Sequence, residues 1–328
     1  MRRPTVWLAA AALLVLSTGA CSRDAVTGLP PLAAKNEAGP KKLVDAIAFF
    51  TRQFNTTDGG LGVMSVDGSG RRALPGGDLG FEPSISPDGR RIAFSRNTDI
   101  GVTSIYVMNV DGTGTTSIVQ GLVFNPGPVW SPDGCQIAFR SNHDGDTGPV
   151  ARISIVNADG TGLHQVSPEP GPNDFAFDES PTWSPTGTQL AFTRNSVLHV
   201  VNVDGTGLTA LPNEDMAINP SWSPDGQRIA YTSLDPFGEI RLRNPDGSNL
   251  AQVTVATPGT FDFWPRWAPD SRRLVMAHVA GDQIETVTIN IDGTNPVNLT
   301  PAGILDFMPD WSHRSADVEF VGSEKCTH

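Results

Sequence analysis

Acidic side chains gather in the segments that lead into several similar stretches of this sequence. Asp178, Asp262 and Asp306 each precede a different stretch. Carboxylate oxygens that converge on one point could bind a divalent cation, and a metal-dependent lyase or lactonase would need such a site. The first chemical hypothesis is therefore a metal-dependent enzyme, and it depends on whether the fold brings these carboxylates together.

Other catalytic signatures are weak. The histidines fall at unrelated positions of the repeat described below, and the sequence has no Gly-x-Ser-x-Gly nucleophile elbow. The Asp-Gly turns are as rich in Asp as calcium loops, but they lack alternating oxygen ligands, and Asp in a tight turn commonly accepts hydrogen bonds from its own backbone. We therefore expect no metal and no other cofactor, and a structural role for these aspartates.

The similar stretches are six copies of one repeat. The first half is Pro, one residue, an apolar residue and Ser-Pro-Asp-Gly, as in PVWSPDG. The second half is an apolar run that ends at Asp-Gly, as in IYVMNVDGTG, and this is a strong hairpin signal because Gly supplies positive φ. The first halves begin at Pro83, Pro128, Pro181, Pro220, Pro265 and Pro309, spaced by 45, 53, 39, 45 and 44 residues. Each repeat predicts two hairpins, or four strands.

The second strand of each repeat, such as RIAFSR, is apolar on both faces, so its sheet must be covered on both sides. Sheets that pack around an axis satisfy this requirement. We predict an all-β fold, a six-bladed β-propeller of four-stranded antiparallel blades over residues 46–322. The repeated tryptophans should fill the gaps between blades; they are Trp130, Trp183, Trp222, Trp267 and Trp311.

The two ends of the repeat region predict how the propeller closes. The chain enters it without an inner strand and leaves it with one at Pro309, so the C-terminal inner strand should complete the N-terminal blade. Either Ala46–Phe50 or Val318–Val321 could be the second strand of that blade.

The motif WSPDGxxIAF followed by IYVMNVDGTG resembles the repeat of the TolB-type WD40-like propellers. The resemblance covers Ala46 to about Gly322. It implies a propeller that binds a partner on one face. It does not extend to the α/β domain that precedes the propeller in TolB, because we expect only a tether before Ala46.

Residues 1–20 have the pattern of a secretion signal, with Arg2 and Arg3 before an apolar run. Small residues directly before Cys21 resemble a bacterial lipobox, in which that cysteine is acylated, although an ordinary cleaved signal peptide is the alternative. We expect a lipidated Cys21, a flexible tether over 21–45 and a tail over 323–328. Ser22 resembles an outer-membrane address, so we expect a lipid-anchored envelope protein facing the periplasm or the cell surface.

The charge composition limits the kinds of molecule that this protein could bind. The 328 residues carry 35 acidic and 23 basic side chains, a net charge of −12, which argues against nucleic acid. The remaining cysteines, Cys135 and Cys326, are expected on opposite faces of the propeller and therefore as free thiols.

Loop length separates the two faces of the predicted propeller. The connections between first and second and between third and fourth strands should be short and share one face. The others should be longer and share the opposite face, the long-loop face, where functional residues usually lie. The candidate binding residues there are Glu82, Asn125, Asp178, Glu179, Asn219, Asp262, Trp264, Asp306 and Phe307.

Two functions remain open from the sequence. We favour a non-enzymatic propeller that holds an envelope protein, peptide or glycan on the long-loop face. The alternative is the metal-dependent enzyme acting in the mouth of the central channel. A purely structural interpretation of the same residues is that the aromatic side chains pack the loops together and the acidic side chains keep the surface soluble.

Overall fold

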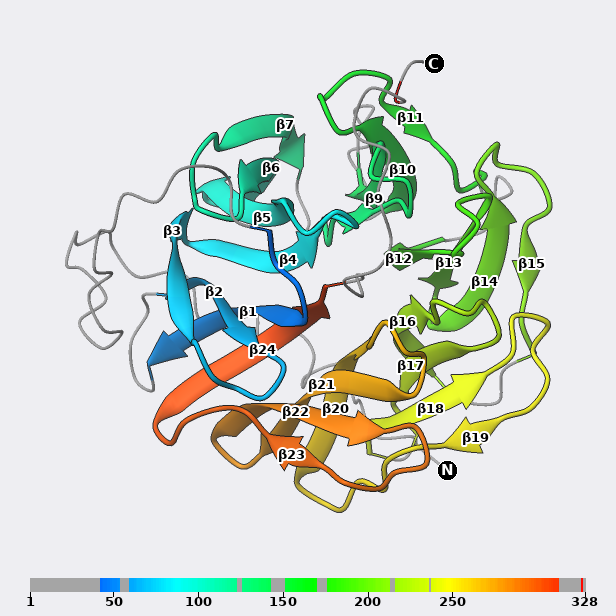
Figure 1. Ribbon diagram of the computed structural model, residues 1–328. Helices are drawn as coiled ribbons and strands as arrows, with labels where there is room; N and C mark the ends of the chain where they lie inside the picture. The colour runs from blue at the N-terminus through cyan, green and yellow to red at the C-terminus, as the bar shows by residue number, and fades with distance from the viewer. Residues whose placement is uncertain are drawn as a thin grey trace.

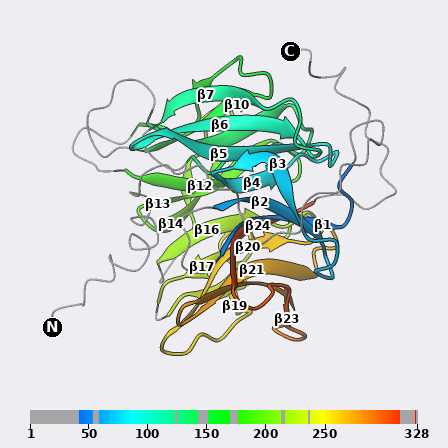
Figure 2. The ribbon, with the colours of Figure 1, turned by 90° about the vertical axis from the view of Figure 1, so that its left-hand side faces the viewer.

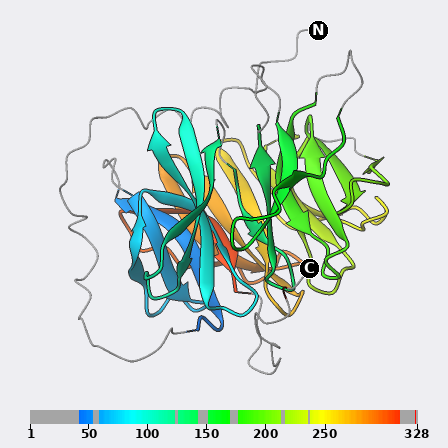
Figure 3. The same cartoon turned by 90° about the horizontal axis from the view of Figure 1, so that it is seen from above.

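The computed structural model describes residues 42–53, 59–122, 126–142, 151–169, 176–212, 216–235, 237–312 and 326. These residues form six four-stranded antiparallel sheets that stand around a common axis (Figure 1). Turned views show the same sheets packed face to face (Figures 2 and 3). The predicted six-bladed propeller is confirmed. Within the described ranges, no helix is long and apolar enough to span a membrane.

In five blades, the four strands are arranged in sequence order from the axis outward. They are β4 (Gly80–Ile85), β5 (Arg91–Asp99), β6 (Val102–Asn109) and β7 (Thr116–Leu122); β8 (Val129–Trp130), β9 (Gln136–Ser141), β10 (Arg152–Asn157) and β11 (His164–Gln165); β12 (Asp178–Trp183), β13 (Gln189–Arg194), β14 (Val197–Asn202) and β15 (Thr209–Ala210). The others are β16 (Ala217–Trp222), β17 (Ile229–Ser233), β18 (Glu239–Arg243) and β19 (Ala251–Gln252); and β20 (Thr260–Trp267), β21 (Arg273–Ala280), β22 (Gln283–Asn290) and β23 (Val297–Asn298).

The closing blade combines both ends of the propeller. Its inner strand is β24 (Ile304–Trp311), followed outward by β1 (Ala46–Gln53), β2 (Gly59–Ser65) and β3 (Arg72–Asp78). The predicted closure is therefore confirmed, and β1 is the second strand. The other candidate, 318–321, lies outside the described residues.

The turns of the repeat are held by their own side chains. In the Ser-Pro-Asp-Gly turn, Ser86 Oγ donates to Asp88 Oδ1 at 2.6 Å. In the Asp-Gly-Thr turn, Thr113 donates to Asp111 Oδ1 through its backbone N at 2.9 Å and its hydroxyl at 2.6 Å. These bonds lower the pKa of Asp111. Gly112 has φ of 86°, and a Cβ there would lie 2.2 Å from Pro75 O, so the turn requires glycine. The structural role expected for the turn aspartates is confirmed.

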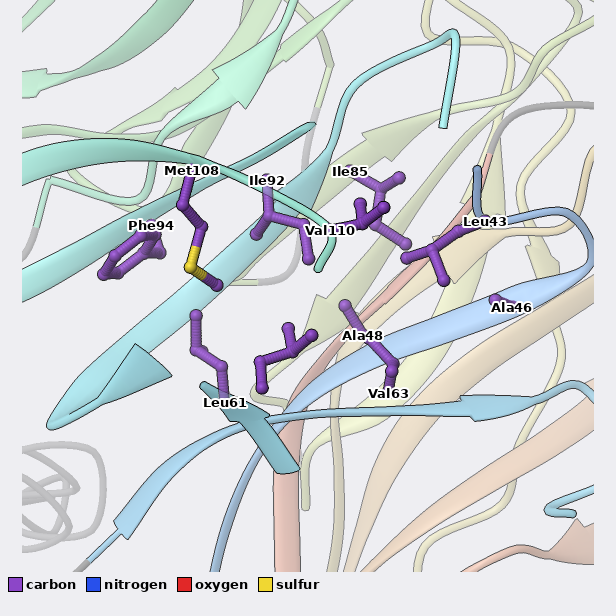
Figure 4. Packing of buried hydrophobic residues seen from close by; sticks show 11 residues of the cluster. Leu43, Ala46, Ala48, Leu61, Val63, Ile85, Ile92, Phe94, Met108 and Val110 are labelled. Atoms are coloured by element: carbon purple, nitrogen blue, oxygen red, sulfur yellow. The ribbon is translucent and has the colours of Figure 1, made fainter. Parts of the chain in front are cut away.

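Side chains from adjacent blades form one core at each junction. Ala48 and Leu61 of the closing blade lie against Ile85, Ile92 and Phe94 of the next blade, all at most 1% exposed (Figure 4). Because both faces of a blade are apolar, each blade needs both neighbours to remove its apolar surface from water.

The repeated tryptophans occupy these junctions, as predicted. Each of three indoles donates from Nε1 to a carbonyl on the preceding inner strand. The pairs are Trp130 to Ser84 O at 3.1 Å, Trp183 to Val129 O at 3.2 Å and Trp267 to Ser221 O at 2.9 Å.

The loop prediction is only partly correct. The first-to-second and third-to-fourth turns do share one face, the short-turn face, as the hydrogen bond from Val110 N to Arg90 O at 3.0 Å shows. On the long-loop face, however, three second-to-third connections are only two residues long: 100–101, 195–196 and 281–282. Asn195 and Ser196 both have positive φ, which suits a two-residue hairpin turn.

The prediction of two free thiols is wrong, because Cys135 and Cys326 form a disulfide with a Cα–Cα distance of 5.6 Å. The free-thiol prediction assumed that the segment after β24 forms a strand that returns to the long-loop face. Instead β1 holds that position in the blade, and β24 ends on the short-turn face, where Cys135 also lies. Cys326 therefore lies beside Cys135 on the short-turn face, and not on the opposite face as predicted.

Loss of this disulfide should destabilise the propeller. It links residues 191 apart, so it restricts the unfolded chain strongly, and we expect Cys135→Ser to lower the free energy of unfolding by about 2–4 kcal/mol. Urea unfolding of the oxidised protein and the variant measures this. Reduced wild-type protein is the control and should unfold with the variant; reduced and oxidised protein of equal stability would contradict the prediction.

Candidate functional site

In each blade, the residue directly before the repeated proline has a positive φ, the left-handed backbone conformation. These residues are Glu82 (φ 51°), Gly127 (54°), Ser180 (53°), Asn219 (52°), Trp264 (52°) and Met308 (55°). In five of the six sheets the pairing with the second strand shifts at this point, as it does between Phe81 and Ser84. The positions are therefore β-bulges, which change the direction of a side chain relative to the regular strand.

These bulges are costly to form. A non-glycine residue held at positive φ costs about 1–3 kcal/mol, and a residue before proline is normally extended. Five of the six are not glycine. The same strained geometry in successive blades is therefore fixed by the packing of the inner strands around the axis.

All six of these residues line one cavity of about 50 Å³. The inner strands β4, β12, β16, β20 and β24 surround the propeller axis (Figure 1). Because these strands and the segment before β8 contribute to the wall of the cavity, the cavity lies on this axis. A volume of this size holds a few water-sized groups, and so it could admit the tip of one side chain. We call it the axial cavity.

The axial cavity has polar walls. Arg266 and Asp310 each lie two residues after a bulge, with Nε and Oδ1 3.9 Å apart. The second oxygen of Asp310 accepts a hydrogen bond from Ile85 N at 2.7 Å, which ties the last inner strand to the first. Asn219 Nδ2 donates to Ser180 Oγ at 3.3 Å.

Glu82 supplies a second carboxylate to the cavity. Its Oε2 accepts hydrogen bonds from Ser95 Oγ at 2.9 Å and from Gly127 N at 2.8 Å. Burial raises the pKa of Glu82, and the charges of Arg140 and Arg266 offset this only in part. An ionised Glu82 is therefore less stable in the folded protein than in water.

Two predicted acids are held by arginines in bidentate pairs. Asp178 Oδ1 and Oδ2 accept from Arg194 Nε at 2.6 Å and Nη2 at 2.7 Å. Asp306 accepts from Arg71 Nη1 at 2.6 Å and Nη2 at 2.5 Å. Both carboxylates are fully buried, so each needs its cation.

Two further predicted acids are also paired. Arg140 Nη1 donates to Glu179 Oε1 at 2.5 Å, and burial nevertheless raises the pKa of Glu179. His278 Nδ1 lies 2.7 Å from Asp262 Oδ1, and this hydrogen bond raises the pKa of His278.

The carboxylates of the metal hypothesis therefore do not converge. Asp178 and Asp262 bond to the neighbouring strand of their own blades, and Asp306 bonds to Arg71, which directly precedes β3 of its own blade. In the described part of the chain, no three His, Cys, Asp or Glu side chains are grouped so that they could hold a metal ion.

A row of aromatic side chains leads along β20 to the cavity. Phe261 and Phe263 have ring centroids 6.0 Å apart, Phe263 and Trp264 5.6 Å, and Trp264 and Phe307 6.4 Å. Phe307 continues to Phe50 at 4.6 Å. Trp264, which is half-buried, belongs both to this row and to the cavity wall.

The structure separates the predicted site residues into three groups. Glu82, Asn219 and Trp264 line the axial cavity. Asp178, Glu179, Asp262, Asp306 and Phe307 lie earlier on the inner strands, nearer the long-loop face, and are absent from the lining. Cys21 and Asn125 lie outside the described residues.

Sequence reasoning missed part of the wall. Ser180, Arg266, Met308 and Asp310 line the cavity but were not predicted. Their signal is positional, because the residues on either side of the repeated proline face the axis. This signal was available in the repeat alignment, whereas the bulge that explains it was not.

Known proteins match this chain through the propeller. Residues 47–197 match the family model of the TolB beta propeller domain. A TolB homolog of Chlorobium luteolum is 32% identical over 115 residues, covering 35% of this chain and 23% of that protein. The uncharacterized peptidase YuxL of Bacillus subtilis is 27% identical over 118 residues, covering 34% of this chain and 17% of the peptidase. The matched part is thus about a fifth of each relative.

A solved structure agrees on the fold. The crystal structure of TolB from Acinetobacter baumannii superposes with a TM-score of 0.70 at 19% identity, covering 82% of this chain and 66% of that one. At this identity the likeness concerns the fold alone.

Removal of the Glu82 charge should stabilise the protein. Because its pKa is raised on folding, the folded state binds the proton more tightly than the unfolded chain, so stability is lost as pH rises through the folded pKa. Glu82→Gln should therefore raise the free energy of unfolding at pH 7 by about 0.5–2 kcal/mol, and the gain should vanish below about pH 4. Urea unfolding at both pH values tests this. Asp282→Asn, at an exposed turn, is the control for charge removal; a Glu82→Gln protein that is less stable at pH 7 would contradict the prediction.

Proposed function

The chain carries a TolB-type β-propeller, and from this premise we propose that it is a non-enzymatic binding protein of the cell envelope. Its partner is a protein, peptide or glycan that contacts the long-loop face and reaches the axial cavity. We favour a protein or peptide, because the small cavity suits one inserted side chain.

The observation that carries this proposal is the ring of strained residues around the cavity. Five non-glycine residues are held at positive φ, and together with Gly127 they line one cavity. Strain of this kind concentrates at ligand sites, where it fixes side chains before the ligand arrives. The neighbouring aromatic row adds a half-buried anchor in Trp264, and Trp is enriched among residues that dominate binding energy.

Binding is favoured over catalysis by the state of the acids. Asp178, Asp262 and Asp306 already bond to a cationic or ionisable partner, so a metal ion would have to displace an arginine from two of them. We therefore do not propose a metal-dependent reaction.

The disulfide supports a location outside the cytosol. Bonds such as Cys135–Cys326 persist in oxidising compartments, including the periplasm and the cell surface. Together with the signal-like residues 1–20, this supports export. We propose that Cys21 carries the lipid and holds the propeller at the outer membrane.

Partner capture from envelope extracts tests the binding face. Trp264→Ala should weaken capture by about 2 kcal/mol or more, which is about thirtyfold, because a buried aromatic contact is lost. Leu250→Ala is the matched control, since Leu250 is exposed on the short-turn face. Capture that survives Trp264→Ala but fails with Leu250→Ala would move the site to the short-turn face.

Cell fractionation tests the anchor. Cys21→Ser should move the protein from the membrane fraction to the soluble fraction, because the acylated side chain is lost. An unchanged membrane fraction would contradict lipidation at this residue.

A further inference from the structure

Glu82 differs from the other acids near the axis in its charge balance. Asp178, Glu179, Asp262 and Asp306 each have a cationic or ionisable partner within 2.7 Å, and Asp310 has Arg266 at 3.9 Å. Among the described residues, Glu82 has no cation within ion-pair distance. Within the described ranges it is therefore the one axial carboxylate that has no ion-pair partner, although Arg140 and Arg266 act on it from a greater distance.

One oxygen of Glu82 is also without a donor. Both of its hydrogen bonds, from Ser95 and Gly127, end on Oε2, and no described residue donates to Oε1. Glu82 is half-buried, and Oε1 is not among the fully buried oxygens that lack a partner, so a ligand in the axial cavity can reach this oxygen and donate to it. The missing donor should also carry positive charge, because Arg266 is shared with Asp310 and the cavity wall keeps a negative charge.

The remaining wall suits a small cation. Asn219 uses Nδ2 for Ser180, so its Oδ1 can accept a hydrogen bond. Trp264 contributes an aromatic ring, which attracts a cation over its face. The volume of about 50 Å³ suits an ammonium group, which has three donors and is close to water in size, better than a planar guanidinium with five donors.

We propose that Glu82 binds a primary ammonium group, carried on an aliphatic stem, that the partner inserts into the axial cavity. A lysine side chain and a chain N-terminus share this chemistry. The inference rests on the proposed function and deepens it. Glu82 Oε1 and Asn219 Oδ1 accept from the ammonium, Trp264 lies beside it, and the inserted charge balances the carboxylate.

Fluorine NMR of the full-length protein labelled with 5-fluorotryptophan tests the site directly. The resonance that disappears in Trp264→Phe identifies the reporter. The probes are Nα-acetyl-lysine N-methylamide, a free-amine alanine N-methylamide, and Nα-acetyl-norleucine N-methylamide as the uncharged match. We expect the lysine probe to shift the Trp264 resonance, with an affinity at least about tenfold above that of the norleucine probe. A response of the alanine probe alone would assign the ammonium to a chain N-terminus.

Variants separate charge recognition from general packing. Glu82→Gln should weaken the lysine probe at least about tenfold while leaving the norleucine probe unchanged. Asp282→Asn removes the same charge from an exposed turn on the long-loop face and should leave both affinities unchanged. Equal binding of the lysine and norleucine probes, or full binding of lysine by Glu82→Gln, would overturn the inference.

The two proposals can fail separately. If the lysine probe binds through Glu82 but wild-type and Glu82→Gln proteins capture an envelope partner equally, the ammonium site stands and the axial cavity is not where that partner binds. If Trp264→Ala abolishes capture while no amine probe shifts the Trp264 resonance, the binding face stands and the ammonium inference is wrong.

Discussion

The structure depends on one constraint: each blade has two apolar faces, and only its two neighbours can cover them. Ile92 and Phe94 on one blade and Ala48 on the next show this at a single junction. A row of such sheets is stable only if it closes on itself, since an open row would leave two apolar faces in water. The strand that closes the ring is β24. It comes from the C-terminal end of the propeller and pairs with β1, so that Ile47 lies opposite Trp311. The disulfide from Cys135 to Cys326 acts on the same segment by limiting how far the C-terminal end can move from the ring.

Closure also explains why the axis can carry specificity. The repeated proline is the same in all six blades, whereas the residue before it is Glu, Gly, Ser, Asn, Trp or Met. Packing of the inner strands fixes the bulge, and the bulge fixes where the variable side chain lies. The chemistry of the axial cavity can therefore change without any change in the apolar junctions. Strain at the bulges is tolerated because the ring as a whole, and not the bulge residue, determines the backbone.

The sequence predicts the frame well and the polar contacts poorly, for a physical reason. Strand order within a blade and the place of the tryptophans follow from local periodicity and turn chemistry, which a single repeat already contains, and the number of copies gives the blade number. The pair of Asp306 with Arg71 joins residues 235 positions apart, and the repeat has no rule for it because Arg71 belongs to one blade only. Cys326 was misplaced because 318–321 was one of two candidates for the second strand of the closing blade, and β1 holds that position instead. Glu82, Asn219 and Trp264 were identified as rim residues, whereas Arg266 and Asp310 were missed, although each directly follows the repeated proline.

The distribution of paired and unpaired acids links stability to recognition. Arginines neutralise Asp178 and Asp306 within their own blades, so these buried charges support the fold and offer little to a ligand. His278 holds Asp262 in a similar way, and its charge depends on pH because the pair raises its pKa. The long-loop side of the propeller is therefore less negative than its count of acids suggests. Among the described acids near the axis, Glu82 is the one without an ion-pair partner, and burial makes its charge unfavourable for folding. The charge of Glu82 lowers the stability of the folded protein while the site is empty, and a bound cation balances it. Binding of a cation therefore removes a free-energy cost of the folded state, and this adds to the stabilisation that the ligand provides.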